Sequence, residues 1–281
     1  MERHLGRLAI ANMVANIVIV VTGGAVRLTG SGLGCPTWPR CTDASYVAHG
    51  ALGIHGAIEF GNRTLTFVLA AVAIACWVAA LRSGQRKPLV LATIIALGIP
   101  AQAVIGGITV LTDLNPWIVS FHLLVSMAMI AVCVLLVDTL RGPARPASSG
   151  QAHRVAWLVF GVGWVVLYLG TVVTGSGPHS GDLESHRTGL DPHVMSHVHA
   201  SAVYALLAFT VGLIVVARRR GDALVAPVAT ALLVVELAQG VIGFTQYFLD
   251  LPEVLVALHM LGAALVSAML AAVVLSTRER V

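Results

Sequence analysis

Residues 102–124 read QAVIGGITVLTDLNPWIVSFHLL, and residues 239–261 read QGVIGFTQYFLDLPEVLVALHML. Matching residues lie 137 positions apart: Gln102, Asp113 and His122 correspond to Gln239, Asp250 and His259. Self-similarity at one long, fixed offset is the mark of an internal structural repeat. The sequence therefore predicts two copies of one unit, each with a histidine at the same place.

Long apolar runs occupy most of the chain. Of the 281 residues, 57% are hydrophobic and 11% are charged, whereas a soluble domain is about 25% charged. A run of about 20 apolar residues can cross a membrane as a helix. We therefore predict an all-α integral membrane protein with eight transmembrane helices, near residues 8–28, 56–81, 89–111, 117–138, 154–174, 193–217, 223–248 and 254–276. The first run lacks a small-residue cleavage site, so we interpret it as a retained helix rather than a signal peptide.

The repeat spacing predicts how the two copies are oriented. Four predicted helices separate equivalent positions, and because this number is even, both copies cross the membrane in the same direction. The predicted architecture is two parallel four-helix-bundle repeats, residues 1–142 and 154–281. Residues 143–153, with several prolines and serines, are predicted to link them.

Basic residues gather on one side of the predicted membrane. That side carries 13 of the 17 Lys and Arg residues, whereas the opposite loops carry Arg27, Arg40, Arg63 and Arg187. Basic loops stay cytoplasmic, so both termini are predicted to be cytoplasmic. The sequence pI of about 9.2 then reflects this topology and contact with membrane lipid headgroups, not nucleic-acid binding.

Cys35 and Cys41 lie in the first external loop, GCPTWPRC at residues 34–41. The external side is oxidising, and five intervening residues with two prolines allow the sulfurs to meet, so a disulfide is predicted. Two unconnected thiols are the alternative. A zinc site is disfavoured, because no second Cys or His pair with ligand spacing accompanies them.

Three histidines lie at matched depth within predicted helices. His122 and His259 each follow the external end of a helix by about six residues, and His199 is similarly placed, so all lie roughly 9 Å below the surface. Ionisable residues inside a span indicate function by default. We predict that His199 and His259 bind the two faces of one haem iron; a metal site or a structural pair is the alternative. His197 would face another direction on the same helix.

The first copy has an incomplete set of ligands. The offset places Asn62 opposite His199, and asparagine is a poor ligand for haem iron. This copy is therefore expected to hold a second haem through His122, with His55 as a candidate second ligand. Such a site suits a molecule that enters and leaves.

Two acids lie within the predicted spans. Glu59 precedes Asn62 on the same helical face, which predicts a role beside the second haem; the alternative is an ion pair with Arg63. Glu236 has Ile99 as its counterpart in the first copy, and its role stays open. The alternative for Glu236 is a polar contact between helices.

Together these residues resemble the haem A synthase family. The resemblance covers essentially the whole chain and is carried by TGGAVRLTGSG at residues 22–32, GCP at 34–36 with Cys41, IEFGNR at 58–63, and the histidines at 122, 199 and 259. Many members have histidine where this sequence has Asn62. The second ligand of the substrate haem therefore stays open between Asn62, His55 and none.

The resemblance implies an enzyme of the bacterial plasma membrane that oxidises the C8 methyl group of haem O to a formyl group by successive hydroxylations. It implies haem B on His199 and His259, substrate haem on His122, and Glu59 as the carboxylate near the reacting methyl. The cysteines match the family's disulfide pair. Arg27 and Arg63 are candidates for charge-assisted bonds to haem propionates. Haem O synthase is an expected partner, and the electron acceptor stays open.

Two other classes of protein fit parts of the pattern. A non-enzymatic b-type cytochrome, exchanging electrons with quinone, would explain the histidine pair without Glu59. A transporter with parallel repeats would have broken helices and a site at the membrane midplane, whereas these histidines lie nearer the surface.

Overall fold

The computed structural model describes residues 2–142, 144–182 and 185–280. Their helices are α1 (Glu2–Leu28), η1 (Gly50–Leu52), α2 (Gly53–Ser83), α3 (Arg86–Leu111), α4 (Pro116–Arg141), α5 (Gly150–Ser176), α6 (Pro192–Arg220), α7 (Val225–Phe248) and α8 (Glu253–Ser276). Among these residues the eight α-helices are long and apolar enough to cross a membrane, and no strand forms. The predicted all-α, multi-pass membrane fold is confirmed.

The observed helices extend past the apolar runs that predicted them. α1 begins at Glu2, several residues before the first run, and α5 begins at Gly150, inside the predicted linker. Because a helix satisfies its own backbone hydrogen bonds, it can continue beyond the hydrocarbon region at no extra cost in unpaired groups. Hydropathy alone therefore underestimates the helix lengths.

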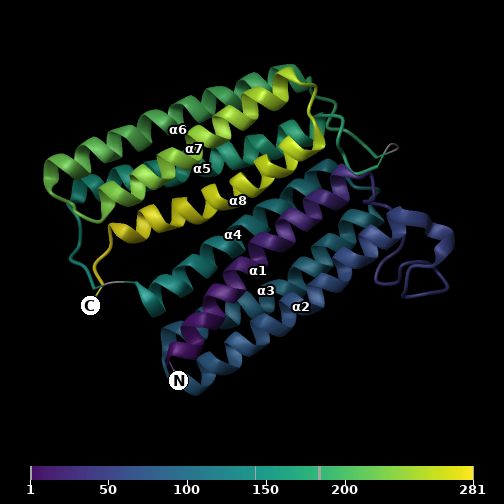
Figure 1. The fold of residues 1–281 in the computed structure, drawn as a ribbon, viewed down its shortest axis with the longest axis horizontal. Helices are drawn as coiled ribbons and strands as arrows, with labels where there is room; N and C mark the ends of the chain where they lie inside the picture. Colours follow the sequence, from purple (N-terminus) through teal and green to yellow (C-terminus); the bar gives the residue numbers. More distant parts are fainter. Residues whose placement is uncertain (1, 143, 183–184, 281) are drawn as a thin grey trace.

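The helices form two groups of four (Figure 1). In the first group each of α1 to α4 packs on the next, and α4 packs back on α1. In the second group α5 to α8 pack in the same order, and α8 packs back on α5. Each group has its own apolar core, with Ile95 and Leu136 buried in the first and Leu213 and Leu270 in the second. The groups meet where α8 packs on α1 and α4, and where α4 packs on α5.

The turns α3–α4 and α7–α8 have the same backbone conformation. Asp113 and Leu114 have φ values of 50° and 57°, and Asp250 and Leu251 have φ values of 56° and 60°. Left-handed backbone is uncommon for residues other than glycine. The sequence repeat thus coincides with a repeated, unusual turn just before α4 and α8.

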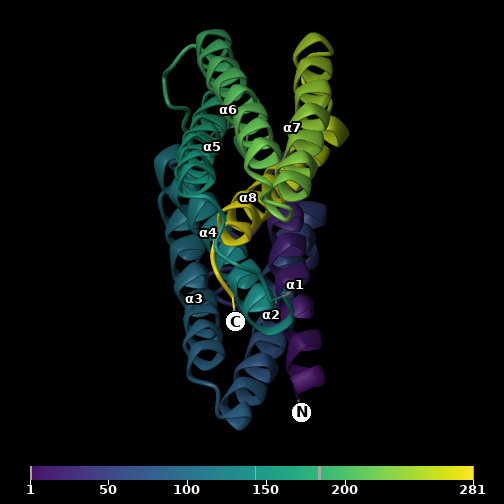
Figure 2. The same cartoon turned by 90° about the vertical axis from the view of Figure 1, so that its left-hand side faces the viewer.

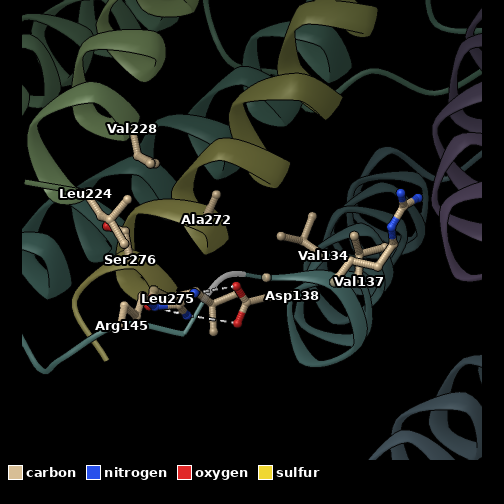
Figure 3. Close-up of a pocket in the computed structure, with 11 residues that line it drawn as sticks. Val134, Val137, Asp138, Arg145, Leu224, Val228, Ala272, Leu275 and Ser276 are labelled. Carbon is tan, nitrogen blue, oxygen red and sulfur yellow. Dashed lines mark hydrogen bonds and ion pairs between the residues drawn. The ribbon is translucent and has the colours of Figure 1, made fainter. Parts of the chain in front are cut away.

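Both termini lie at the left-hand ends of the helices in Figure 1, the side that faces the viewer in Figure 2 and where the two groups are tied together. Arg145 donates to both carboxylate oxygens of Asp138 at 2.9 Å and to the carbonyls of Leu275 and Arg278. Figure 3 shows this ion pair beside a cavity of about 300 Å³ between α4, α7 and α8. These bonds hold the segment after α4 against the end of α8.

Candidate functional site

Local signals at the start of α4 set the depth of His122. Pro116 is the first residue of the helix, and the Asn115 side chain caps it by accepting a hydrogen bond from the Trp117 amide. Proline in the first turn with an asparagine cap is a favoured helix start. His122 therefore lies two turns into α4, as His259 does in α8.

α6 begins in the same way. Pro192 is its first residue, and the Asp191 carboxylate accepts hydrogen bonds from the amides of His193 and Val194. The bonds from Val194 and His193 lower the pKa of Asp191, because they stabilise its charged form. His199 follows two turns later, so the three histidines lie at similar distances from the starts of their helices.

The matched histidines each pack against a glycine of the preceding helix: His122 against Gly106, His199 against Gly170, and His259 against Gly243. A Cβ atom on these glycines would lie 3.2, 3.3 and 3.5 Å from the imidazole Cε1, respectively. Small residues allow this close approach between membrane helices. Sequence analysis did not single out these glycines, although Gly106 and Gly243 are themselves separated by the repeat offset.

A second contact recurs behind two of the histidines. The Gln102 side-chain amide donates to the carbonyl of His122 at 3.1 Å, and the Gln239 amide donates to the carbonyl of His259 at 2.8 Å. Each glutamine thus ties the helix that carries the histidine to the preceding helix. His122 and His259 thus have the same glycine and glutamine contacts with the preceding helix.

His199 and His259 face each other across a cavity of about 320 Å³ that is lined by residues of α4 to α8. Their ring centroids are 6.5 Å apart, and Nδ1 of each ring is buried without a hydrogen-bond partner in the described structure. Two imidazoles bound on opposite sides of one metal through bonds of about 2 Å have ring centres roughly 6 to 6.5 Å apart. The pair therefore fits a single metal ion between the rings.

His197 takes a different position from His199. Its side chain is exposed, and its ring contacts the ring of Tyr247, with centroids 6.1 Å apart. His197 does line the rim of the same cavity. It is nevertheless His199, as the repeat predicts, that is placed opposite His259.

In the first group of helices, Asn62 and His55 both have polar partners. Thr22 donates to the side-chain oxygen of Asn62 at 2.8 Å, and Nδ1 of His55 lies 3.0 Å from the Ser31 hydroxyl. Asn62 thereby joins α2 to α1. His55 is exposed and held by the segment that follows α1.

Glu59 is buried and holds the loop between α1 and α2. One carboxylate oxygen accepts from the Cys35 amide at 2.6 Å, and the other accepts two bonds from Arg63, at 2.5 and 3.1 Å. Arg63 also donates to the carbonyls of Cys35, Thr37 and Arg40. The ion pair considered as the alternative for Glu59 is present, and it carries a network of loop contacts.

The disulfide predicted between Cys35 and Cys41 is present, which confirms that prediction. The loop that it closes reaches across to α3, where Trp38 lies directly over Gly107. A Cβ atom on Gly107 would fall 2.3 Å from Cδ2 of Trp38. Because Gly106 is the next residue along α3, this places the loop close to the helix segment against which His122 packs.

Arg27 holds the end of α5 and the loop between α5 and α6. Its guanidinium donates to the carbonyls of His179 and Thr174, at 2.5 and 2.9 Å. Arg27 and Arg63, both singled out from the sequence, thus each hold one loop.

Glu236 is buried on α7 at the edge of the His199–His259 cavity. One carboxylate oxygen accepts from the Thr210 hydroxyl on α6 at 2.9 Å. The polar interhelical contact considered as the alternative for Glu236 is therefore present.

A sequence model of the cytochrome oxidase assembly protein family matches residues 6–51 and 54–178, which is more than half of the chain. The haem A synthase of Geobacillus kaustophilus is 30% identical over 152 residues, covering 50% of this chain and 45% of that protein. The haem A synthase of Bacillus licheniformis is 26% identical over 184 residues, covering 62% of this chain and 59% of that protein. The matched part thus spans about half the length of the curated relatives. This chain, with its membrane-spanning helices, belongs to the family of cytochrome oxidase assembly proteins.

Proposed function

We propose that this protein is a haem A synthase. In this reaction the C8 methyl group of haem O is hydroxylated twice, and the resulting gem-diol loses water to give the formyl group of haem A. The observation that carries the proposal is the facing pair of His199 and His259, in a chain whose curated relatives are named haem A synthases. A pair of imidazoles at this distance suits a haem iron.

Haem B is the proposed cofactor, and His199 and His259 are the residues that would hold its iron. The ring separation of 6.5 Å, the buried Nδ1 atoms and the adjoining cavity fit such a group. Bound there, the haem supplies one-electron redox chemistry. Gly170 and Gly243 behind the rings allow the imidazoles of His199 and His259 to pack closely on the preceding helices.

Haem O is proposed to bind in the first group of helices, through His122. This histidine has the same glycine and glutamine contacts as His259. At the position opposite His199 in the repeat, Asn62 is engaged by Thr22, and His55 is the remaining candidate for a second ligand. Weaker ligation suits a substrate that must leave as product.

Glu59 is the proposed catalytic carboxylate. Because the Cys35 amide and Arg63 engage both of its oxygens, the carboxylate is fixed in position. A fixed carboxylate is suited to stabilising positive charge at the reacting methyl carbon, and Oε2, which accepts one hydrogen bond, keeps a lone pair that can accept a proton. The hydrogen bonds from the Cys35 amide and from Arg63 also connect Glu59 to the loop that would cover the substrate.

Arg27 and Arg63 are proposed to meet the substrate propionates. Arg27 uses Nε and Nη2 in its described hydrogen bonds, which leaves Nη1 to donate to a propionate oxygen. Arg63 donates to the disulfide loop from Nη1 and Nη2, so any propionate contact would be shared with that loop. Substrate binding would then order both loops.

The proposed setting is the plasma membrane of a bacterium, with both termini in the cytoplasm and the disulfide loop outside. The distribution of Lys and Arg supports this orientation. Residues 1–142 and 154–281 form the proposed substrate and cofactor units, joined by residues 143–153. Haem O synthase is the proposed source of substrate.

The test is haem extraction from a host that makes haem O but lacks its own haem A synthase. Cells expressing this protein should accumulate haem A, and cells expressing His122→Ala should retain haem O. A protein that binds haem B but yields no haem A in either case would instead be a b-type cytochrome that only transfers electrons.

A further inference from the structure

Glu236 lines the same cavity as His199 and His259. Its side chain is almost fully buried, with the residue 2% exposed. Thr210 donates to Oε1, whereas Oε2 is buried without a hydrogen-bond partner in the described structure. Among the described residues that line this cavity, Glu236 is the one acid.

The position of Glu236 along α7 separates it from the proposed ligands. It lies about 10 Å along the helix axis from Gly243, against which His259 packs, at a rise of 1.5 Å per residue. This separation is too large for direct contact with the iron. It is short enough for strong electrostatic coupling where the effective dielectric constant is low.

Other titratable groups also face the cavity. They are His197 and Tyr204 on α6 and Tyr247 on α7, in addition to the proposed ligands His199 on α6 and His259 on α8. The parts of α4 and α5 that line the cavity carry none. His197 and Tyr247 lie nearer the ends of their helices that carry the proposed ligands than Glu236 does, and they serve as controls.

The unpaired oxygen makes the charge on Glu236 depend on its surroundings. A carboxylate inside a membrane protein is costly unless a positive charge or enough donors compensate it, and Thr210 supplies one donor. An oxidised haem with two neutral imidazole ligands carries a net charge of about +1 at its iron–porphyrin core, and the reduced form carries none. Reduction therefore removes the charge that would stabilise the carboxylate.

We propose that Glu236 takes up the proton that accompanies reduction of the haem held by His199 and His259. This inference rests on the proposed function only in requiring that haem. When the iron gains one electron from a one-electron donor, the Glu236 carboxylate gains one proton from water and becomes a carboxylic acid. Oxidation releases both, so the charge within the site is conserved.

The experiment measures the haem midpoint potential of the purified, haem-loaded protein by optical redox titration with small one-electron mediators over a range of pH. In the native protein, the reduction equilibrium should change by up to tenfold per pH unit, about 59 mV for one electron. Glu236→Gln, which can still accept from Thr210, should lose most of this dependence. His197→Gln and Tyr247→Phe should keep it.

Infrared difference spectra provide a second measurement on the native protein. Reduction should produce the C=O band of a protonated carboxyl group, and Glu236→Gln should lack that band. Thr210→Val removes the donor to Oε1 and should move the pH-dependent region to higher pH. This variant and the native infrared spectrum test the inference if Glu236→Gln does not load haem.

The outcomes separate the inference from the proposed function. A native protein whose haem potential is independent of pH, or a Glu236→Gln variant with an unchanged slope, overturns the role of Glu236 and leaves the enzyme proposal intact. Absence of haem B from the purified native protein overturns both.

Discussion

The imidazole rings of His199 and His259 face each other from α6 and α8, with their centroids 6.5 Å apart and their planes inclined at 76°. No short stretch of sequence contains both rings, so the pair exists only because two helices of the second group are held at matched depth. The arrangement leads directly to the first prediction.

Replacing either His199 or His259 with alanine should abolish the low-spin haem B spectrum of the purified protein, because each change removes one of two axial ligands. His197→Ala should retain the spectrum, since its ring packs on Tyr247 instead. The measurement is the reduced-minus-oxidised absorbance spectrum at equal protein concentration. Full haem retention in both single variants would show that the pair is not the haem site.

Gly170→Ala should weaken haem binding at the same site. The new Cβ would lie 3.3 Å from Cε1 of His199, so the ring must move by a few tenths of an ångström. We expect about a fivefold loss of haem affinity, equivalent to about 1 kcal/mol. Gly161→Ala on the same helix meets no atom within 4 Å and is the matched control. Equal haem titration curves for the two variants would contradict this account.

Cys35 and Cys41 should resist alkylation in the unreduced, denatured protein, because they form a disulfide. Cys76 and Cys133 are buried free thiols and should label fully under those conditions, which provides an internal control. Mass spectrometry of the peptides gives the result. Quantitative labelling of all four cysteines would rule the bond out.

Glu59→Gln should fold, keep haem B on His199 and His259, and make little or no haem A. The change preserves shape but removes the charge that pairs with Arg63. Haem extraction from cells with matched expression measures the effect. Near-normal haem A production would remove Glu59 from the mechanism.

A comparison with Arg63→Lys separates the chemical role of Glu59 from its role in holding the loop. Lysine keeps the positive charge but cannot reproduce the forked contacts to Glu59, Cys35 and Thr37. Limited proteolysis should show a looser first external loop in this variant. If it also retains substantial haem A production, the loss in Glu59→Gln is due to the carboxylate itself.

Asp138→Asn should destabilise the protein by about 2 kcal/mol, because it leaves the buried Arg145 guanidinium without its counter-charge. Thermal unfolding in detergent should show a lower Tm. The exposed Glu253→Gln change at the opposite end of the molecule should alter stability by less than about 0.5 kcal/mol. A Tm for Asp138→Asn equal to that of the control would mean that the ion pair does not stabilise the junction.

Sequence alone determined the helical membrane fold and the depth of the histidines. Apolar runs longer than the hydrocarbon core leave helices as the practical way to satisfy the backbone, and proline with Asn115 or Asp191 sets where α4 and α6 begin. The constant offset of the repeat then pointed to His199 rather than His197. These signals are local or periodic, so they can be read along the chain.

Only the tertiary structure decided which groups meet across helices. Pairing of Glu59 with the Cys35 amide, of Trp38 with Gly107, and of Glu236 with Thr210 depends on how helices and loops rotate and pack against one another. Membrane helices associate through close packing and polar contacts rather than through a hydrophobic pattern, because the lipid is as apolar as the helix surface. Hydropathy therefore does not indicate how each helix is rotated about its own axis. The partners of these buried polar groups become known only once the helices are packed.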